Sequence, residues 1–126
     1  MLAERSSAPI DFGRWASLGD AFISLITVSE LLVGVHRANT PERRATRSAF
    51  VEAILSRIPA IPFSAEVARI HAGIFAELTH HRTVVGAHDL LIAATALAHG
   101  YPVMTGNTAE FERVPGLRVI NPLEFG

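Results

Sequence analysis

Short apolar segments of strand length alternate with longer segments of helical period along this chain. Strands are predicted where apolar residues follow one another without interruption, and helices where they recur every three or four positions. An alternating order of this kind predicts an α/β fold with a small parallel sheet. The predicted strands are 22–26, 101–104 and 117–120, with 58–63 as an extended segment at the sheet edge, and the predicted helices are 11–18, 27–37, 41–57, 64–80 and 89–99.

The segment 89–99 is the most apolar of the predicted helices. It is apolar nearly all round, so we expect it at the centre of the molecule, and Gly100 is expected to end it. Two other helices carry one apolar stripe each, which predicts one buried face. The stripes are Phe50, Val51, Ile54, Leu55 and Ile58 in the first helix, and Val67, Ile70, Ile74, Phe75 and Leu78 in the second.

The composition excludes several classes of protein. With 126 residues, of which 49% are hydrophobic, the chain can form one domain with a packed core. It has no cysteine, which excludes disulfides, thiolate zinc sites and cysteine nucleophiles. The longest apolar run, 90–97, is too short to span a bilayer, and we see no secretion signal. We therefore expect a cytoplasmic protein with no membrane partner.

The charge pattern argues against broad, nonspecific binding of nucleic acid. The formal net charge is −1 at pH 7, although Arg43, Arg44 and Arg47 cluster on one predicted helix. A local basic groove is compatible with this cluster. A solvated helix face explains the same three arginines and is the simpler interpretation.

Acidic and amide side chains stand near the starts of predicted helices and the ends of predicted strands. Glu30 follows the strand 22–26, Asp89 opens the most apolar helix, and Asn107 follows the strand 101–104. In an α/β chain such positions lie at one edge of the sheet, where ligands bind. Oxygen side chains gathered there suit a hard cation such as Mg²⁺ or Mn²⁺.

Helix capping offers a simpler explanation for the two acids. Thr27 and Glu30 have the spacing of a capping box, and Asp89 has the position of an N-cap. Spacing alone favours the capping role for Glu30 and leaves the role of Asp89 undecided.

The polar cluster after the strand 101–104 contains further candidates. Asn107 and Glu110 form a box-like capping pair, and the neutral Asn107 could offer an ion only a carbonyl oxygen. Thr105 and Glu110 are weaker site candidates. The histidines lack the spacing of a zinc site, and His88 is a weak candidate for contact with phosphate.

Three motifs and the tail of the chain together resemble one known family. They are Thr27-Val-Ser-Glu30-Leu-Leu-Val-Gly-Val, Asp89-Leu-Leu-Ile-Ala-Ala-Thr-Ala-Leu-Ala, Met104-Thr-Gly-Asn107-Thr-Ala-Glu-Phe111 and Arg113-Val-Pro-Gly-Leu-Arg-Val-Ile-Asn121-Pro. In this order and spacing, from Ala21 to Pro122, the chain resembles a PIN-domain endoribonuclease of the VapC toxin type.

The resemblance implies a PIN-like three-layer α/β/α domain whose catalytic and metal-binding residues are Glu30, Asp89 and Asn107. It implies an RNA substrate and a cognate VapB-type antitoxin as partner. It implies Mg²⁺ as the cofactor, with Mn²⁺ as an alternative. Hydrophobic residues of the early helices would receive the antitoxin, although a place in the core explains them more simply. The candidates are Phe12, Trp15, Leu31 and Val35. We also expect a homodimer, because a small chain of this hydrophobic content exposes part of its apolar surface.

The start of the chain departs from the family pattern. The family opens with a short apolar strand that ends in a metal-binding aspartate, and 1–5 resembles the helix that follows that strand. Asp11 and Asp20 are poor substitutes for that aspartate. We therefore expect a single PIN-like domain over 1–126 that lacks the usual first strand, and we favour a mis-set start or a truncated gene as the cause.

Two functions remain open at this point. The first is a Mg²⁺-dependent endoribonuclease toxin that an antitoxin neutralises. The second is a catalytically impaired PIN-like protein that only binds the antitoxin or an intact toxin. The first aspartate separates them, because its presence upstream in the same frame supports the enzyme and its absence supports the binding protein.

Overall fold

The structure, a computed structural model, describes residues 21–122. Short strands and helices alternate in the order β1 (Ile23–Ser24), α2 (Leu25–His36), α3 (Pro41–Arg57), β2 (Ala60–Ile61), α4 (Ala65–His80), α5 (Ala87–His99), β3 (Val103–Met104), α6 (Thr108–Phe111) and β4 (Val119–Ile120). This order confirms the predicted α/β pattern. The predicted helix 11–18 and the expected loss of a first strand lie outside the described residues.

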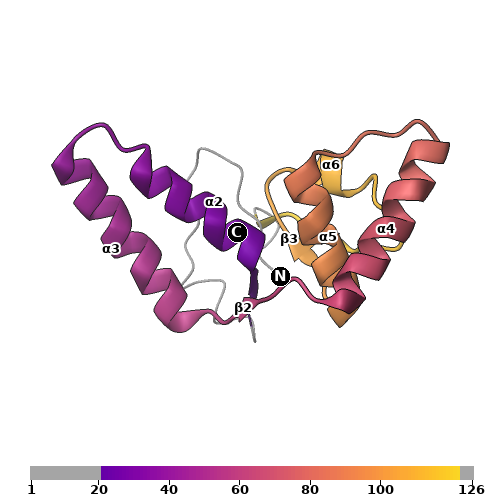
Figure 1. Ribbon diagram of the computed structural model, residues 1–126, viewed down its shortest axis with the longest axis horizontal. Coiled ribbons are helices and arrows are strands. Elements are labelled where there is room, and N and C mark those ends of the chain that lie inside the picture. Colours follow the sequence, from indigo (N-terminus) through magenta and orange to yellow (C-terminus); the bar gives the residue numbers. More distant parts are fainter. Residues whose placement is uncertain (1–20, 123–126) are drawn as a thin grey trace.

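The helices form two groups with the strands between them. Figure 1 shows α2 and α3 side by side at one end of the molecule, and α4, α5 and α6 at the other. This arrangement agrees with the predicted three-layer domain.

The described strands form two parallel pairs. In β1 and β2, Ile23 lies opposite Ala60, and in β3 and β4, Val103 lies opposite Val119. The two pairs approach each other through side chains. The rings of Phe22 and Tyr101 stack with 5.1 Å between their centroids, and Met104 packs against the Ile23 cluster.

Helix α5 is central, as its composition predicts. Its side chains from Leu90 to Ala96 are nearly all buried, and they pack against α4, α6 and β3 in the larger of two hydrophobic clusters. Gly100 ends the helix with φ of 69°, a left-handed conformation that favours glycine, and its N–H donates to the carbonyls of Ala96 and Leu97.

The start of α2 differs from the prediction. Ser24 is the N-cap, and its Oγ accepts a hydrogen bond from the Thr27 N–H at 3.1 Å. Thr27 lies inside the first turn and is buried. The predicted capping box of Thr27 and Glu30 is therefore wrong, because a serine three residues earlier already satisfies the amide at the start of the helix.

Two aromatic residues of the predicted stripes are not in the core. Phe50 is 49% exposed and Phe75 is 57% exposed, whereas the other stripe positions are buried or half-buried.

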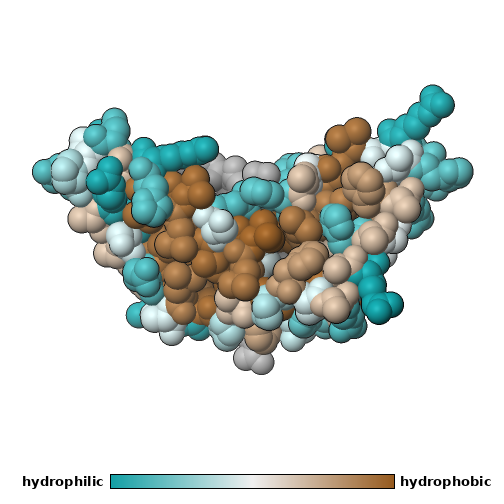
Figure 2. All heavy atoms as spheres, in the orientation of Figure 1, coloured by the Kyte–Doolittle hydropathy of each residue, from teal (hydrophilic) through white to brown (hydrophobic). Residues whose placement is uncertain are grey.

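Figure 2 shows hydrophobic residues gathered across the middle of one face, with hydrophilic residues toward both ends. Within 21–122, no helix has the length and apolar character that crossing a membrane requires.

Candidate active site at the start of helix α5

The first turn of α5 carries the most deeply buried acidic side chain of the described residues. The helix begins at Ala87 with Gly86 as its N-cap, so Asp89 lies within the first turn and is not the cap residue that spacing allowed. Asp89 is only 1% exposed. The positive end of the helix dipole favours a carboxylate at this position, which offsets part of the cost of burying it.

Glu110 meets Asp89 at this point of the chain. The Gly86 N–H donates a short hydrogen bond to Glu110 Oε1, and the Asn107 side-chain amide donates to Glu110 Oε2 at 2.8 Å. A Cβ placed on Gly86 would lie 3.0 Å from Glu110 Oε1 and 3.8 Å from Asp89 Oδ2. The lack of a side chain at Gly86 therefore leaves room for both carboxylates beside its α-carbon.

Thr105 and Asn107 form the turn that presents Glu110. Thr105 is fully buried at the end of β3, and its Oγ1 accepts a hydrogen bond from the Asn107 N–H at 3.0 Å. Asn107 is the N-cap of α6 but makes no side-chain cap bond. The predicted capping role of Asn107 and Glu110 is thus wrong, because both side chains bond to each other and Glu110 reaches Gly86.

Glu30 approaches the same end of α5 from α2. Its Oε2 lies 3.6 Å from Nδ1 of His88, the residue next to Asp89. The Glu30 side chain is 24% exposed, and that of His88 is 56% exposed. The structure therefore gathers all three predicted site residues around the start of α5, with Asn107 joined through Glu110 and Glu30 through His88.

The donor atoms of this cluster suit a hard divalent cation. They are carboxylate oxygens of Asp89, Glu110 and Glu30 and the amide oxygen of Asn107, with no sulfur. Over 21–122, however, no three histidine, cysteine, aspartate or glutamate side chains stand close enough together to hold a metal ion. The chemistry of these donor atoms fits such an ion. Among the described residues, however, the side chains come together in pairs and not in groups of three.

Two residues matter more here than the sequence suggested. Glu110 was a weak candidate, yet it is the carboxylate beside Asp89. Gly86 was not singled out, because its role depends on a residue 24 positions away. The one local feature that points to Gly86 is its position just before His88 and Asp89.

Comparisons with known proteins identify the family of the chain. The PIN domain family matches residues 2–117 of the chain. Ribonuclease VapC1 of Rickettsia felis is 41% identical over 107 residues, which cover 85% of this chain and 80% of that protein. The tRNA(fMet)-specific endonuclease VapC of Salmonella typhimurium is 42% identical over 98 residues, covering 77% of this chain and 71% of that protein.

A solved structure shows the same fold. The crystal structure of DNA-bound VapBC from Salmonella typhimurium superposes with a TM-score of 0.78 at 35% identity, covering 88% of this chain and 83% of that one. Sequence and fold therefore lead to one conclusion, which is that this chain belongs to the PIN-domain family and is of the VapC type.

Proposed function

We propose that this protein is a divalent-metal-dependent endoribonuclease that acts as the toxin of a toxin–antitoxin pair in the cytoplasm. The observation that supports this most is the buried carboxylate of Asp89, with the Glu110 carboxylate beside the same glycine, Gly86, and Glu30 beside His88. Mg²⁺ is the proposed ion, with Mn²⁺ as a substitute. The nuclease names of relatives that are 41% and 42% identical support the same chemistry.

The proposed roles of the residues follow from charge. Hydrolysis of a phosphodiester needs an activated water and neutralisation of phosphate charge, and a divalent ion bound here would supply both. Asp89, Glu30 and Asn107 are the proposed ligands, and Glu110 joins them. Without a cation, the same carboxylates would repel an RNA phosphate, so the bare site disfavours substrate.

The Gly86 N–H and the Asn107 amide would act on Glu110 by positioning it. Each donates to one carboxylate oxygen, which fixes the plane of the carboxylate before substrate binds. A fixed carboxylate loses less conformational entropy when it takes up a ligand. Thr105 supports the arrangement one step further away, through the Asn107 N–H.

A small antitoxin protein is the proposed partner. Structures that resemble this chain are of VapBC complexes, such as the DNA-bound complex from Salmonella typhimurium. The hollow between α2 and α3 offers a surface of suitable kind, since Glu30 and the apolar Leu31 and Val35 all line it. A protein segment seated there would cover Glu30 and so block the site.

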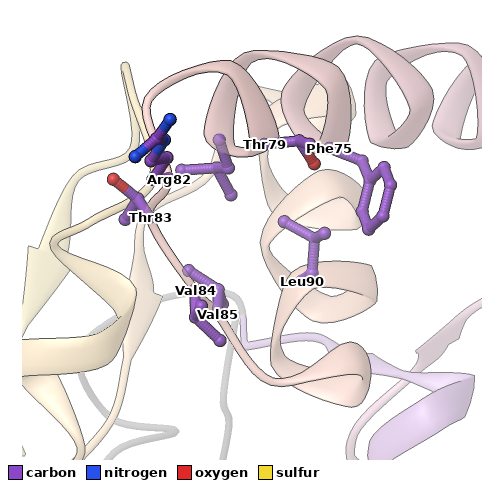
Figure 3. A pocket seen from close by; sticks show the side chains of 8 residues that line it. Phe75, Thr79, Arg82, Thr83, Val84, Val85 and Leu90 are labelled. Atoms are coloured by element: carbon purple, nitrogen blue, oxygen red, sulfur yellow. The ribbon is translucent and has the colours of Figure 1, made fainter.

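A homodimer is the proposed state of the free chain. An apolar hollow of about 360 Å³ lies between the end of α4, the loop 81–86 and the start of α5. Figure 3 shows Phe75 and Leu90 on two helices and Val84 on the loop around it. Phe75 and the 76% exposed Val84 leave apolar surface that a second copy could cover.

A second candidate function is an impaired protein that binds the antitoxin or an intact toxin without cutting RNA. The absence, within the described range, of three clustered metal-binding side chains favours it.

One cleavage assay separates the two functions. Purified protein is incubated with initiator tRNA and with an elongator tRNA, in Mg²⁺, in Mn²⁺ and with a chelator. The enzyme predicts cleavage that the chelator stops, that added metal restores and that Asp89→Asn abolishes. Glu77→Gln is the control, because Glu77 is an exposed acid on another helix, α4. No cleavage by the wild type, together with tight antitoxin binding, would support the binding protein.

A further inference from the structure

We propose that Arg43 and Arg47 on α3 bind the RNA backbone next to the scissile phosphate. This inference rests on the proposed nuclease function and assigns a substrate-binding surface to it. The two arginines lie one helical turn apart, so their side chains share a face of α3.

Arg47 connects the acidic site to Arg43. It lines the hollow of about 240 Å³ that Glu30, Leu31, Gly34, Val35, Phe50 and Val51 also line. It lines a second hollow, of similar volume, together with Glu42, Arg43 and Thr46. A strand of RNA that leaves the acidic cluster past Glu30 therefore meets Arg47 first and Arg43 next.

Both guanidinium groups are held in place but keep donors for a ligand. Arg47 Nη1 donates to the Gly34 carbonyl at 3.0 Å, and Arg43 Nη1 donates to Asn39 Oδ1 at 2.8 Å. A guanidinium has five N–H donors, so each arginine retains most of them. Arg44 differs because it lines neither hollow; its Nη2 donates to the Ala38 carbonyl at the turn between α2 and α3.

Charge favours a polyanion at this surface. Both arginines are exposed, and neither forms an ion pair with a carboxylate of the described residues, although Glu42 lines the same hollow. The chain has a net charge of −1, so attraction of RNA must be local. The planar fork of an arginine also matches the two oxygens of a phosphate.

Binding is measured with Asp89→Asn as the background, so that RNA stays intact. The probe is fluorescently labelled tRNA, titrated at several salt concentrations. Arg43→Gln and Arg47→Gln should each weaken binding about 5- to 10-fold and flatten the slope of log K against log salt by about 0.7 to 1. Arg57→Gln on the same helix is the matched control, since Arg57 is exposed and lines neither hollow.

Activity and fold are measured on the same substitutions. In the active protein, Arg43→Gln should raise KM with little change in kcat, as expected for a contact made before and during reaction. Arg47→Lys should recover part of the affinity, because the charge returns without the fork. Melting curves check that α2 and α3 still pack when the Arg47 bond to Gly34 is lost.

Three results would overturn the proposal. The first is that Arg43→Gln and Arg47→Gln have the same RNA affinity and salt slope as Arg57→Gln. The second is that their weaker binding is fully explained by a lower Tm. The third is loss of antitoxin binding with RNA binding unchanged, which would assign the arginines to the protein partner. If Asp89→Asn instead still cleaves RNA while the arginine variants bind it weakly, the proposed catalytic site fails and the RNA surface remains.

Discussion

At the scale of single residues, the site depends on the lack of a side chain at Gly86. Gly86 is the N-cap of α5 with φ of −56°, a backbone conformation that any residue can adopt. What requires glycine is the space beside the α-carbon, which the carboxylates of Glu110 and Asp89 both approach. A larger residue would displace Glu110, because that carboxylate also accepts the bond from the Gly86 N–H.

Gly86→Ala tests this role. The new methyl group would stand 3.0 Å from Glu110 Oε1, closer than such atoms normally approach. Glu110 must move, and we expect metal affinity and cleavage to fall about tenfold, the usual effect of disturbing groups that orient ligands. Calorimetry with Mn²⁺ and the tRNA cleavage rate measure the two effects.

Gly73→Ala is the matched control. A Cβ at Gly73 meets nothing within 4 Å, and the residue lies inside α4. This change should leave cleavage unchanged and stabilise the fold by up to about 1 kcal/mol, because alanine favours a helix over glycine. A loss of cleavage in both variants would show that Gly86 has no particular role at the site.

At the scale of elements, α2 carries Glu30 and is held at its start by one buried serine. Ser24 Oγ accepts from the Thr27 N–H and also lies 3.1 Å from Thr27 Oγ1. Ser24 is 1% exposed. The cap therefore fixes the junction of β1 and α2, from which the position of Glu30 follows.

Ser24→Ala should lower the free energy of unfolding by about 1 to 2 kcal/mol, because it leaves a buried amide without its acceptor. Ser29→Ala is the control, since Ser29 is exposed on the same helix and should change stability by less than about 0.5 kcal/mol. Denaturant titration measures both. Equal stability of the two variants would mean that the cap contributes nothing to α2.

The elements also show how far sequence reasoning reaches. The apolar pattern predicted the central place of α5. The predicted starts of the helices 41–57 and 64–80 agree to within one residue with α3 and α4, which Thr40 and Ser64 cap. The start of α2 was predicted wrongly, because the sequence pattern favoured Thr27 as the cap and the structure has Ser24. The bond from Gly86 to Glu110 spans 24 positions, and no local pattern encodes a contact of that range.

At the scale of the whole molecule, the site is where separately packed parts meet. Glu30 comes from the α2–α3 end, and Asp89, Asn107 and Glu110 come from the α4–α6 end (Figure 1). The approach of His88 Nδ1 to Glu30 Oε2 is a direct contact between them. The position of Glu30 relative to Asp89 therefore depends on how the two ends pack against the strands.

Self-association belongs to this scale as well. We expect the free protein to sediment as a dimer and Phe75→Glu to shift it toward the monomer, because a charge cannot be buried cheaply against an apolar surface. Arg69→Glu is the control, a charge reversal at another exposed position on α4. A wild type that stays monomeric at high concentration would contradict the proposed dimer.

Binding of Mn²⁺ tests the central proposal that the carboxylates at the start of α5 hold the ion needed for cleavage. Electron paramagnetic resonance counts free Mn²⁺ directly, and the same samples are assayed on tRNA. We predict that the wild type binds Mn²⁺ and cleaves, and that Asp89→Asn loses cleavage and at least about tenfold in Mn²⁺ affinity while keeping its Tm. Wild-type Mn²⁺ affinity in Asp89→Asn, or cleavage by that variant in the presence of a chelator, would contradict it.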